Sequence, residues 1–482
     1  MPSLNFSLIQ FSDKKIFWFF SAICILSFNL AIILKSPVPA LLPFGLIFAL
    51  FTINSVKHLY YVFFFLLPFS IEIELPGGFG TDIPSEPIMI ILMGLSLILL
   101  IQKASLVDKR IFTHPITLII ALHISWIAIT SIFSTNSFIS VKYLMAKLWY
   151  VVPFYFLPLL IFKDEKDIRP IFKMLSLGLF IAISFVMLQH ASLGFTFDSI
   201  NKAVRPIFRN HVNYAIMLLA FLPFLSYLLV SSKKKGILKY LLLVYLLVAI
   251  YLTFTRAAQA ASVMAIGVYF VIRWRLMKYA VGAALIALVA SVLFLTTENK
   301  YLDFAPNFEK TIEHKNFDNL VEATAKMEDI STVERFYRWV AGFYMVDKKP
   351  LLGHGPSTFY TQYKAYTVTS YKTYVSDNPE KSGIHNNYLM VAVEQGIPGL
   401  IIILMLALLP LIVAEQIYHK MKKSKDRTLL VSAAICYALI NIVILINDLL
   451  EADKIGPFYF LSASIIVLFS LNIDRDKSAI TE

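Results

Sequence analysis

The chain has 482 residues, of which 58% are hydrophobic and 15% are charged, and its mean hydropathy is +0.72. Soluble globular proteins carry about 25% charged residues, so this composition excludes a water-soluble enzyme and a disordered or fibrous chain. The formal net charge is +12. In a soluble protein that charge would suggest nucleic-acid binding, but in a membrane protein basic residues first determine topology.

Apolar stretches long enough to cross a bilayer recur along the whole chain, and they predict about 12 to 14 membrane-spanning helices. We therefore expect an all-α polytopic membrane protein. The predicted spans lie near residues 16–34, 38–54, 57–70, 87–102, 115–134, 148–162, 170–190, 211–230, 237–254, 257–273, 279–296, 387–413, 428–447 and 456–472. The first span is too long for a cleavable signal peptide and is expected to stay as an anchor.

Lysine and arginine gather in alternate loops, for example at 233–235 and 420–427. Short loops rich in these residues remain in the cytoplasm, so both termini are predicted to be cytoplasmic. The excess positive charge then explains orientation, and nucleic acid drops out as a partner. The two cysteines, Cys24 and Cys436, lie in apolar runs, which excludes a disulfide framework.

One long polar segment interrupts the hydropathy pattern at residues 298–388, on the outward side. It divides the chain into an N-terminal membrane bundle (1–297), a periplasmic loop domain (298–386) and C-terminal membrane helices (387–482). Within the segment, 311–326 and 331–346 are predicted to be amphipathic helices. A glycine-rich turn at 350–356 and a tyrosine-rich stretch follow. A loop of this length usually has a function.

The candidate chemistry consists of a few arginines and one histidine at the outward ends of spans: Arg205, Arg209, Arg256 and His385. Guanidinium groups bind two phosphate oxygens at once and keep their charge. A neutral histidine accepts a proton from a hydroxyl nucleophile. Arginines at span ends also anchor lipid headgroups, but Arg256 lies on the outward side in a very tight connection, which favours a functional role.

Other chemistries are poorly represented. A zinc site formed by His354 and His385 lacks supporting ligands, and we expect no metal and no cofactor. The sequence has no phosphate-binding loop, dinucleotide fingerprint or nucleophile elbow. The tyrosines Tyr360 and Tyr363 either stack on sugar rings or act as interfacial anchors.

Four elements together resemble the O-antigen ligase/polymerase superfamily and cover about residues 200–400. They are 335–339 with 350–359, 385–389 with 394–400, 253–256, and 205–208 with Asn210 and 213–215. Two arginines, Arg205 and Arg209, compete for one position of the last element, and Thr255 replaces a serine in 253–256.

The resemblance implies a membrane glycosyltransferase of the GT-C type in the bacterial inner membrane, with its active site facing the periplasm. Such an enzyme takes a glycan from an undecaprenyl-pyrophosphate donor and inverts the anomeric centre without a metal. In the ligase, the acceptor is a sugar hydroxyl of lipid A–core. By this resemblance, His385 is the catalytic residue, as the general base or as the group that orients the acceptor. The implied pyrophosphate ligands are Arg205, Arg256, Arg209 and Arg335. The candidate acceptor or glycan contacts are Asn386, Tyr388, Tyr360, Tyr363 and Glu394.

Two related activities use the same donor: the O-antigen or exopolysaccharide polymerase, and the protein O-oligosaccharyltransferase. The sequence does not separate them from the ligase. A transporter of lipid-linked sugars is a different class of protein. It would be expected to show duplicated halves and charges in many spans, whereas the charges here gather at one face.

Overall fold

The computed structural model describes residues 56–481 apart from 76–78, 103–106, 233–235, 299, 301–329, 369–375, 377–382 and 423, with a few positions before residue 56. Predicted spans 16–34 and 38–54 lie largely or wholly outside the described residues, and so does the predicted helix 311–326. The predicted helix 331–346 is confirmed as α16 (Ile330–Lys348).

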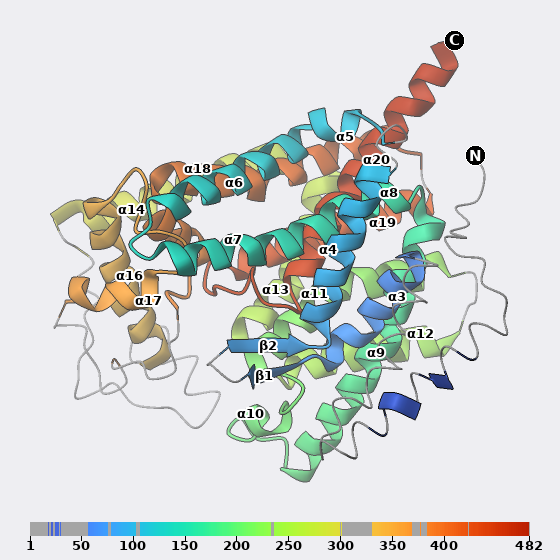
Figure 1. Ribbon diagram of the computed structural model, residues 1–482, viewed down its shortest axis with the longest axis horizontal. Helices are drawn as coiled ribbons and strands as arrows, with labels where there is room; N and C mark the ends of the chain where they lie inside the picture. The colour runs from blue at the N-terminus through green and yellow to red at the C-terminus, as the bar shows by residue number, and fades with distance from the viewer. Residues whose placement is uncertain are drawn as a thin grey trace.

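The protein is an all-α polytopic membrane protein (Figure 1). In the described part of the chain, nine helices are long and apolar enough to cross a membrane. They are α4 (Ser85–Gln102), α6 (Pro115–Ile132), α7 (Ser137–Val151) continued through η4 (Val152–Phe156) and α8 (Leu157–Ile161), α9 (Glu165–Ser192), α11 (His211–Ser231), α14 (Met277–Thr296), α18 (Asn387–Lys420), α19 (Lys425–Val443) and α20 (Gly456–Thr481).

Three further predicted spans form helices that fall short of these nine in length or apolar character. They are α3 (Val56–Leu66) with η2 (Leu67–Phe69), α12 (Ile237–Tyr251) and α13 (Arg256–Arg273). Short helices α5 (Arg110–Thr113), α10 (Ile200–Ala203), α17 (Phe359–Gln362) and η6 (Tyr363–Tyr366) occupy connections.

A small β-hairpin connects η2 to α4, and the sequence analysis did not predict it. Strand β1 (Ile71–Leu75) pairs antiparallel with β2 (Phe79–Ile83), with Ile71 opposite Ile83 and Glu72 opposite Asp82. The run from Ile71 to Leu75 alternates apolar and acidic residues, which is the two-residue period of a half-buried strand. The hairpin lies beside α10 in Figure 1.

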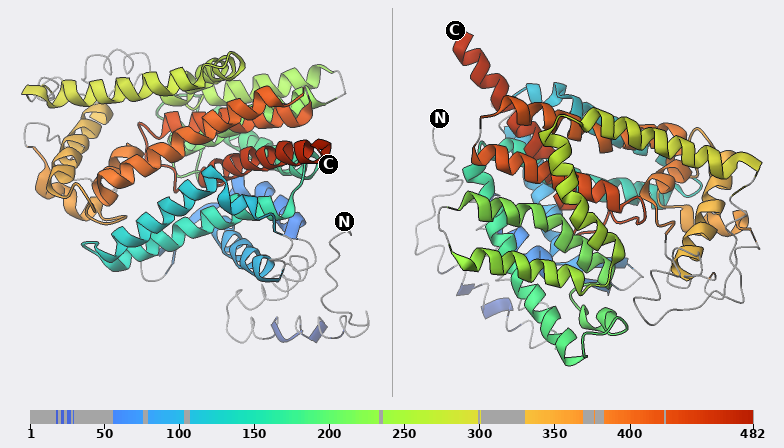
Figure 2. Two further views of the ribbon diagram at one scale, coloured as in Figure 1. Left: turned by 90° about the horizontal axis from the view of Figure 1, so that it is seen from above. Right: turned by 180° about the vertical axis from the view of Figure 1, so that it is seen from behind.

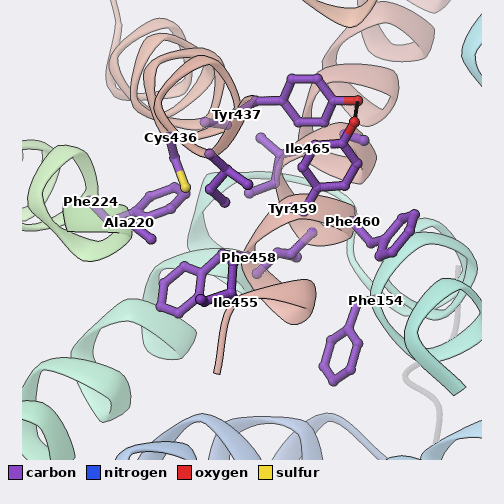
Figure 3. Packing of buried hydrophobic residues seen from close by; sticks show 14 of the residues in the cluster. Phe154, Ala220, Phe224, Cys436, Tyr437, Ile455, Phe458, Tyr459, Phe460 and Ile465 are labelled. Atoms are coloured by element: carbon purple, nitrogen blue, oxygen red, sulfur yellow. Dashed lines mark hydrogen bonds between the residues drawn. The ribbon is translucent and has the colours of Figure 1, made fainter. Parts of the chain in front are cut away.

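Helices α11, α19 and α20 form the centre of the bundle, where α19 packs against both of the others. Figure 3 shows this core, in which the Tyr437 and Tyr459 hydroxyls lie 2.7 Å apart and Phe224 stacks near Phe458. In contrast, α14 runs along the outer edge of the molecule (Figure 2), and 6% of its apolar stretch is buried, against 83% for α20. An apolar helix left uncovered by protein is suited to contact with lipid.

Helix α18 is broken at Gly396, whose backbone is not helical (φ 73°, ψ −178°). Asn441 of α19 contacts both halves: its side-chain oxygen accepts from the Tyr388 hydroxyl at 3.0 Å, and its amide nitrogen lies 3.5 Å from the Ala407 carbonyl oxygen. A straight helix would separate residues 388 and 407 by about 28 Å, too far for one asparagine to contact both. The segments 387–395 and 397–420 therefore fold back on each other at Gly396.

The loop that precedes α17 satisfies the backbone groups that this break exposes. The amides of His354 and Gly355 donate to the carbonyls of Val393 and Glu394 at 2.9 and 2.8 Å. The Ile397 amide donates to the carbonyl of Pro350 at 2.7 Å. Buried backbone groups are costly to leave unpaired, so loop 350–359 and the break in α18 stabilise each other.

The same loop is also tied to the turn between α6 and α7. The amide and hydroxyl of Thr135 both donate to the His354 carbonyl at 2.9 Å, and the Ser140 hydroxyl donates to the Pro356 carbonyl at 2.7 Å. The loop therefore links α6, α7, α16 and α18 at one end of the bundle.

We expect Gly396→Ala to lower the free energy of unfolding by about 2 kcal/mol or more, because a Cβ at a positive φ is strained and would lie 2.2 Å from the Leu351 carbonyl oxygen. Thermal unfolding in detergent micelles measures this effect. The control is Gly267→Ala, since Gly267 lies within α13 with no atom within 4 Å of an added Cβ. Equal melting temperatures for the two variants would contradict this account of the break.

Candidate active site

His385 lies two residues before α18, next to the start of the segment 387–395 that folds back at Gly396. Its backbone is left-handed (φ 56°), and the next residue, Asn386, caps α18 by accepting from the Leu389 amide at 3.0 Å. Helix α16 holds the preceding residues: Arg338 donates to the Gly383 carbonyl at 3.1 Å and Trp339 to the Ile384 carbonyl at 3.0 Å. Hydrogen bonds thus hold the residues immediately before and after His385.

The imidazole faces a carboxylate that the sequence analysis did not single out. Nδ1 of His385 lies 3.5 Å from Oδ1 of Asp448, which belongs to the connection between α19 and α20. The backbone amide of Asn387 donates to the Ile444 carbonyl of the same connection at 2.9 Å. A carboxylate at Nδ1 favours the tautomer in which Nε2 carries the free lone pair.

The surroundings keep His385 uncharged near neutral pH. Burial lowers the pKa of His385 to about 4, although the negative charge of Asp448 opposes this shift, and the positive charges of Arg335 and Arg338 lower the pKa further. Because the folded state disfavours the protonated ring, the imidazole is available as a proton acceptor at pH 7.

Arg335 and Arg338 lie one turn apart on α16. Arg338 is buried, and its guanidinium lies 3.3 Å from the carboxylate of Glu334, which also accepts from the Ser376 hydroxyl at 2.6 Å. Arg338 therefore serves mainly to hold residues around His385. Arg335 is half-buried and acts on the histidine through its charge.

Arg205 and Arg209 lie on the loop between α10 and α11, and both are exposed. Nε of Arg209 lies 3.8 Å from the Glu72 carboxylate of the hairpin. Among the described residues, the Arg205 guanidinium has no hydrogen bond or ion pair with a side chain. Of the two competing arginines, Arg205 is therefore the one whose donors remain available.

A buried lysine connects this arginine loop to the connection between α19 and α20. Nζ of Lys454 donates to the carbonyls of Ser70, at 2.7 Å, and Ile207, and it lies 4.3 Å from the centre of the Phe208 ring. Burial lowers the pKa of Lys454, and the charges of Asp453 and Asp82 oppose that shift. The connection 444–455 therefore contacts both the histidine and the loop that carries Arg205 and Arg209.

Arg256 is the first residue of α13, after a turn in which Phe254 has a left-handed backbone (φ 53°). The Phe254 ring packs edge-on against His190 at the end of α9 and against Phe197 in the segment leading to α10. The turn that carries Arg256 and the segment before Arg205 thus lie at the same end of the bundle.

Most of the predicted glycan contacts are engaged within the protein. The Tyr388 hydroxyl binds Asn441, and Tyr363 is fully buried and stacks on Phe359 with ring centres 4.9 Å apart. The buried carboxylate of Glu394 accepts from the amides of Ser357 and Phe359 at 2.8 and 3.1 Å. Asn386 caps α18. Tyr360 is half-buried, and its ring centre lies 6.2 Å from that of Tyr363.

The connection 444–455 carries the residues that the sequence analysis missed. It places Asp448, Glu451, Asp453 and Lys454 between two apolar spans, and Asp453 and Lys454 are buried. The signal was present in the run of charges itself, because ionisable groups gathered directly between two apolar spans are candidates for a functional site. Within the described part of the chain, no three histidine, cysteine or carboxylate side chains come together as metal ligands.

Comparison with known families gives one match. Residues 241–404 match the family model described as O-antigen ligase. The matched segment includes Arg256, Arg335 and His385, whereas Arg205 and Asp448 lie outside it. No curated protein matches the chain.

We expect His385 to titrate near pH 4, below the ordinary histidine value, so the ring should stay neutral at pH 5.5. Carbethoxylation, which requires neutral imidazole, measures this pKa by mass spectrometry, with exposed His58 as the accessible reference. Asp448→Asn should lower the pKa of His385 further, because it removes the charge that favours the imidazolium. A pKa of His385 above its ordinary value would contradict this description of its surroundings.

Proposed function

We propose that this multi-pass membrane protein, whose residues 241–404 match the O-antigen ligase family model, transfers a glycan from undecaprenyl pyrophosphate to a sugar hydroxyl of lipid A–core at the periplasmic face. The observation that carries the proposal is the pairing of a half-buried, neutral His385 with Asp448, close to the charges of Arg335 and Arg338. The histidine with its carboxylate is suited to act as a general base, and the two arginines are suited to bind an anion beside it.

In the proposed reaction, Nε2 of His385 takes the proton from the acceptor hydroxyl. The resulting oxygen nucleophile attacks the anomeric carbon of the donor glycan, and the bond from that carbon to the pyrophosphate oxygen breaks. The lipid pyrophosphate leaves with the bonding electrons, and the anomeric centre inverts. Asp448 orients the imidazole through Nδ1, as the carboxylate does in other histidine-dependent transferases and hydrolases.

Arginines supply the charge that the leaving pyrophosphate requires. Arg205 has an exposed guanidinium, and Arg256 stands in the first turn of α13. The helix dipole disfavours a cation at that position but favours an anion, so a bound phosphate would stabilise both the helix end and Arg256. Arg209 and Arg335 add positive charge nearby. In this scheme guanidinium groups perform the charge neutralisation, and the activity is expected to be independent of added metal.

The acceptor separates the ligase from its relatives. A polymerase transfers the glycan to a second lipid-linked glycan, and a protein O-oligosaccharyltransferase transfers it to a serine or threonine. A panel of lipid A–core, lipid-linked glycan and a serine-rich polypeptide, offered with one donor, distinguishes the three activities. Uptake of lipid-linked sugar without any transfer would favour the transporter instead.

His385→Ala should reduce glycan transfer by at least about 10³-fold, and Asp448→Asn by at least about 10²-fold, because the neutral ring loses its orienting carboxylate. Transfer by the purified protein in nanodiscs, followed by electrophoresis of the glycolipid product, measures both effects. His58→Ala serves as the control at an exposed histidine. Near-normal transfer by folded His385→Ala would remove the proposed base from the mechanism.

Arg256→Lys should lower kcat/KM for the donor by about 10- to 100-fold, since lysine keeps the charge but loses the two-pronged contact with phosphate. The matched control is Arg273→Lys at the opposite end of the same helix, which should retain activity. Steady-state kinetics with varied donor tests this expectation, and equal behaviour of the two variants would exclude bidentate binding by Arg256.

A further inference from the structure

A second polar cluster lies on the α7 side of the connection 444–455, apart from the arginines. Oε1 of Glu451 accepts from the Tyr143 hydroxyl at 2.8 Å and from Nζ of Lys147, and the Tyr150 hydroxyl donates to the Glu451 carbonyl at 2.7 Å. Lys147 also lies 5.3 Å from the centre of the Tyr143 ring. We call Glu451, Lys147 and Tyr143 the α7 cluster.

The hydrogen bonds of this cluster are incomplete. Both interactions of the Glu451 carboxylate use Oε1, and within the described residues Oε2 has no partner. The Lys147 side chain is 2% exposed, yet its ammonium, which has three donors, has one hydrogen-bond partner among the described residues. Buried polar groups are normally satisfied, so the unused donors and acceptor suit a polar ligand.

The cluster is open on one side only. The Glu451 side chain is 29% exposed, whereas Lys147 behind it is almost inaccessible. Oε2 of Glu451 is therefore available as a hydrogen-bond acceptor, while two donors to Oε1 hold the carboxylate in place. Since the lysine and the carboxylate neutralise each other, a neutral ligand is favoured over an anion.

The position of the cluster relates it to His385. Glu451 follows Asp448 by three residues, so their Cα atoms lie within about 11 Å, roughly the length of a disaccharide. Lys454, at the far end of the same connection, contacts the loop of Arg205 and Arg209. The connection thus contacts the arginine loop at one end and carries Glu451, the hydroxyl-binding group of the α7 cluster, three residues earlier.

We infer that the α7 cluster binds a neutral sugar residue of the acceptor, with a hydroxyl of that sugar donating to Oε2 of Glu451. This inference rests on the proposed function. It identifies Glu451 as an acceptor-binding residue, with Lys147 and Tyr143 as positioning residues. The sugar next to the reacting one would occupy this cluster while the reacting hydroxyl approaches His385.

Glu451→Gln tests the inference, because the amide oxygen can still accept from Lys147 and Tyr143 while Oε2 is replaced by a donor. The full-length protein in nanodiscs is assayed with varied lipid A–core and with varied donor. We expect the KM for lipid A–core to rise about tenfold or more, the loss typical of a hydrogen bond to a charged group, and the donor KM to stay unchanged.

Two further variants separate binding from folding. Tyr143→Phe removes one of the two donors to Oε1 of Glu451 and keeps Oε2 as an acceptor. It should therefore raise the KM for lipid A–core less than Glu451→Gln does. Asp167→Asn breaks the Lys57–Asp167 ion pair elsewhere in the bundle and should leave both KM values unchanged. Melting temperatures check that each variant is folded.

Binding of core oligosaccharide without donor, measured by microscale thermophoresis, keeps this inference independent of catalysis. Weaker binding by Glu451→Gln supports the acceptor site even if no transfer is detected. In that case the proposed reaction is contradicted and the acceptor site is not. Wild-type binding by folded Glu451→Gln overturns the inference, as does an equal rise in both KM values.

Discussion

The reversal of α18 at Gly396 is the constraint on which the rest of this end of the molecule depends. Breaking a helix exposes backbone amides and carbonyls, and leaving them unpaired in a buried position is costly. Loop 350–359 satisfies them, and it can approach so closely because Gly353 and Gly396 have no side chain at the points of contact. The reversal carries residues 387–395 back toward α19, and His385 is thereby placed beside Asp448.

The connection between α19 and α20 is the second organising feature. It is short, rich in charged residues and largely buried, and isolated charges in such a setting are expensive. Each charged group has a partner from another part of the chain: Asp448 meets His385, Glu451 meets Lys147, Asp453 accepts from the Ser85 hydroxyl, and Lys454 meets the carbonyl of Ile207. One segment therefore sets the relative positions of these regions.

This arrangement suits a reaction between two amphiphilic substrates. An anionic leaving group and a neutral hydroxyl acceptor need different surroundings, and a transferase must keep them apart until the reacting atoms meet. In the proposed function, exposed and half-buried arginines attract the pyrophosphate, while burial keeps His385 neutral so that it accepts a proton. The packed core of α11, α19 and α20 supplies the rigid frame for these groups.

The sequence by itself determined the class of protein, the order and approximate bounds of most helices, and the residue types of a phosphate-handling site. Hydropathy identifies a span because transfer into lipid is a sum over neighbouring residues, and helix α16 followed from its own periodicity. Only the tertiary structure decided that α18 turns back on itself, that a hairpin follows η2, and that Asp448, Glu451 and Lys454 face three different partners. Those contacts join residues tens to hundreds of positions apart, and no local pattern encodes which distant group a buried charge will meet.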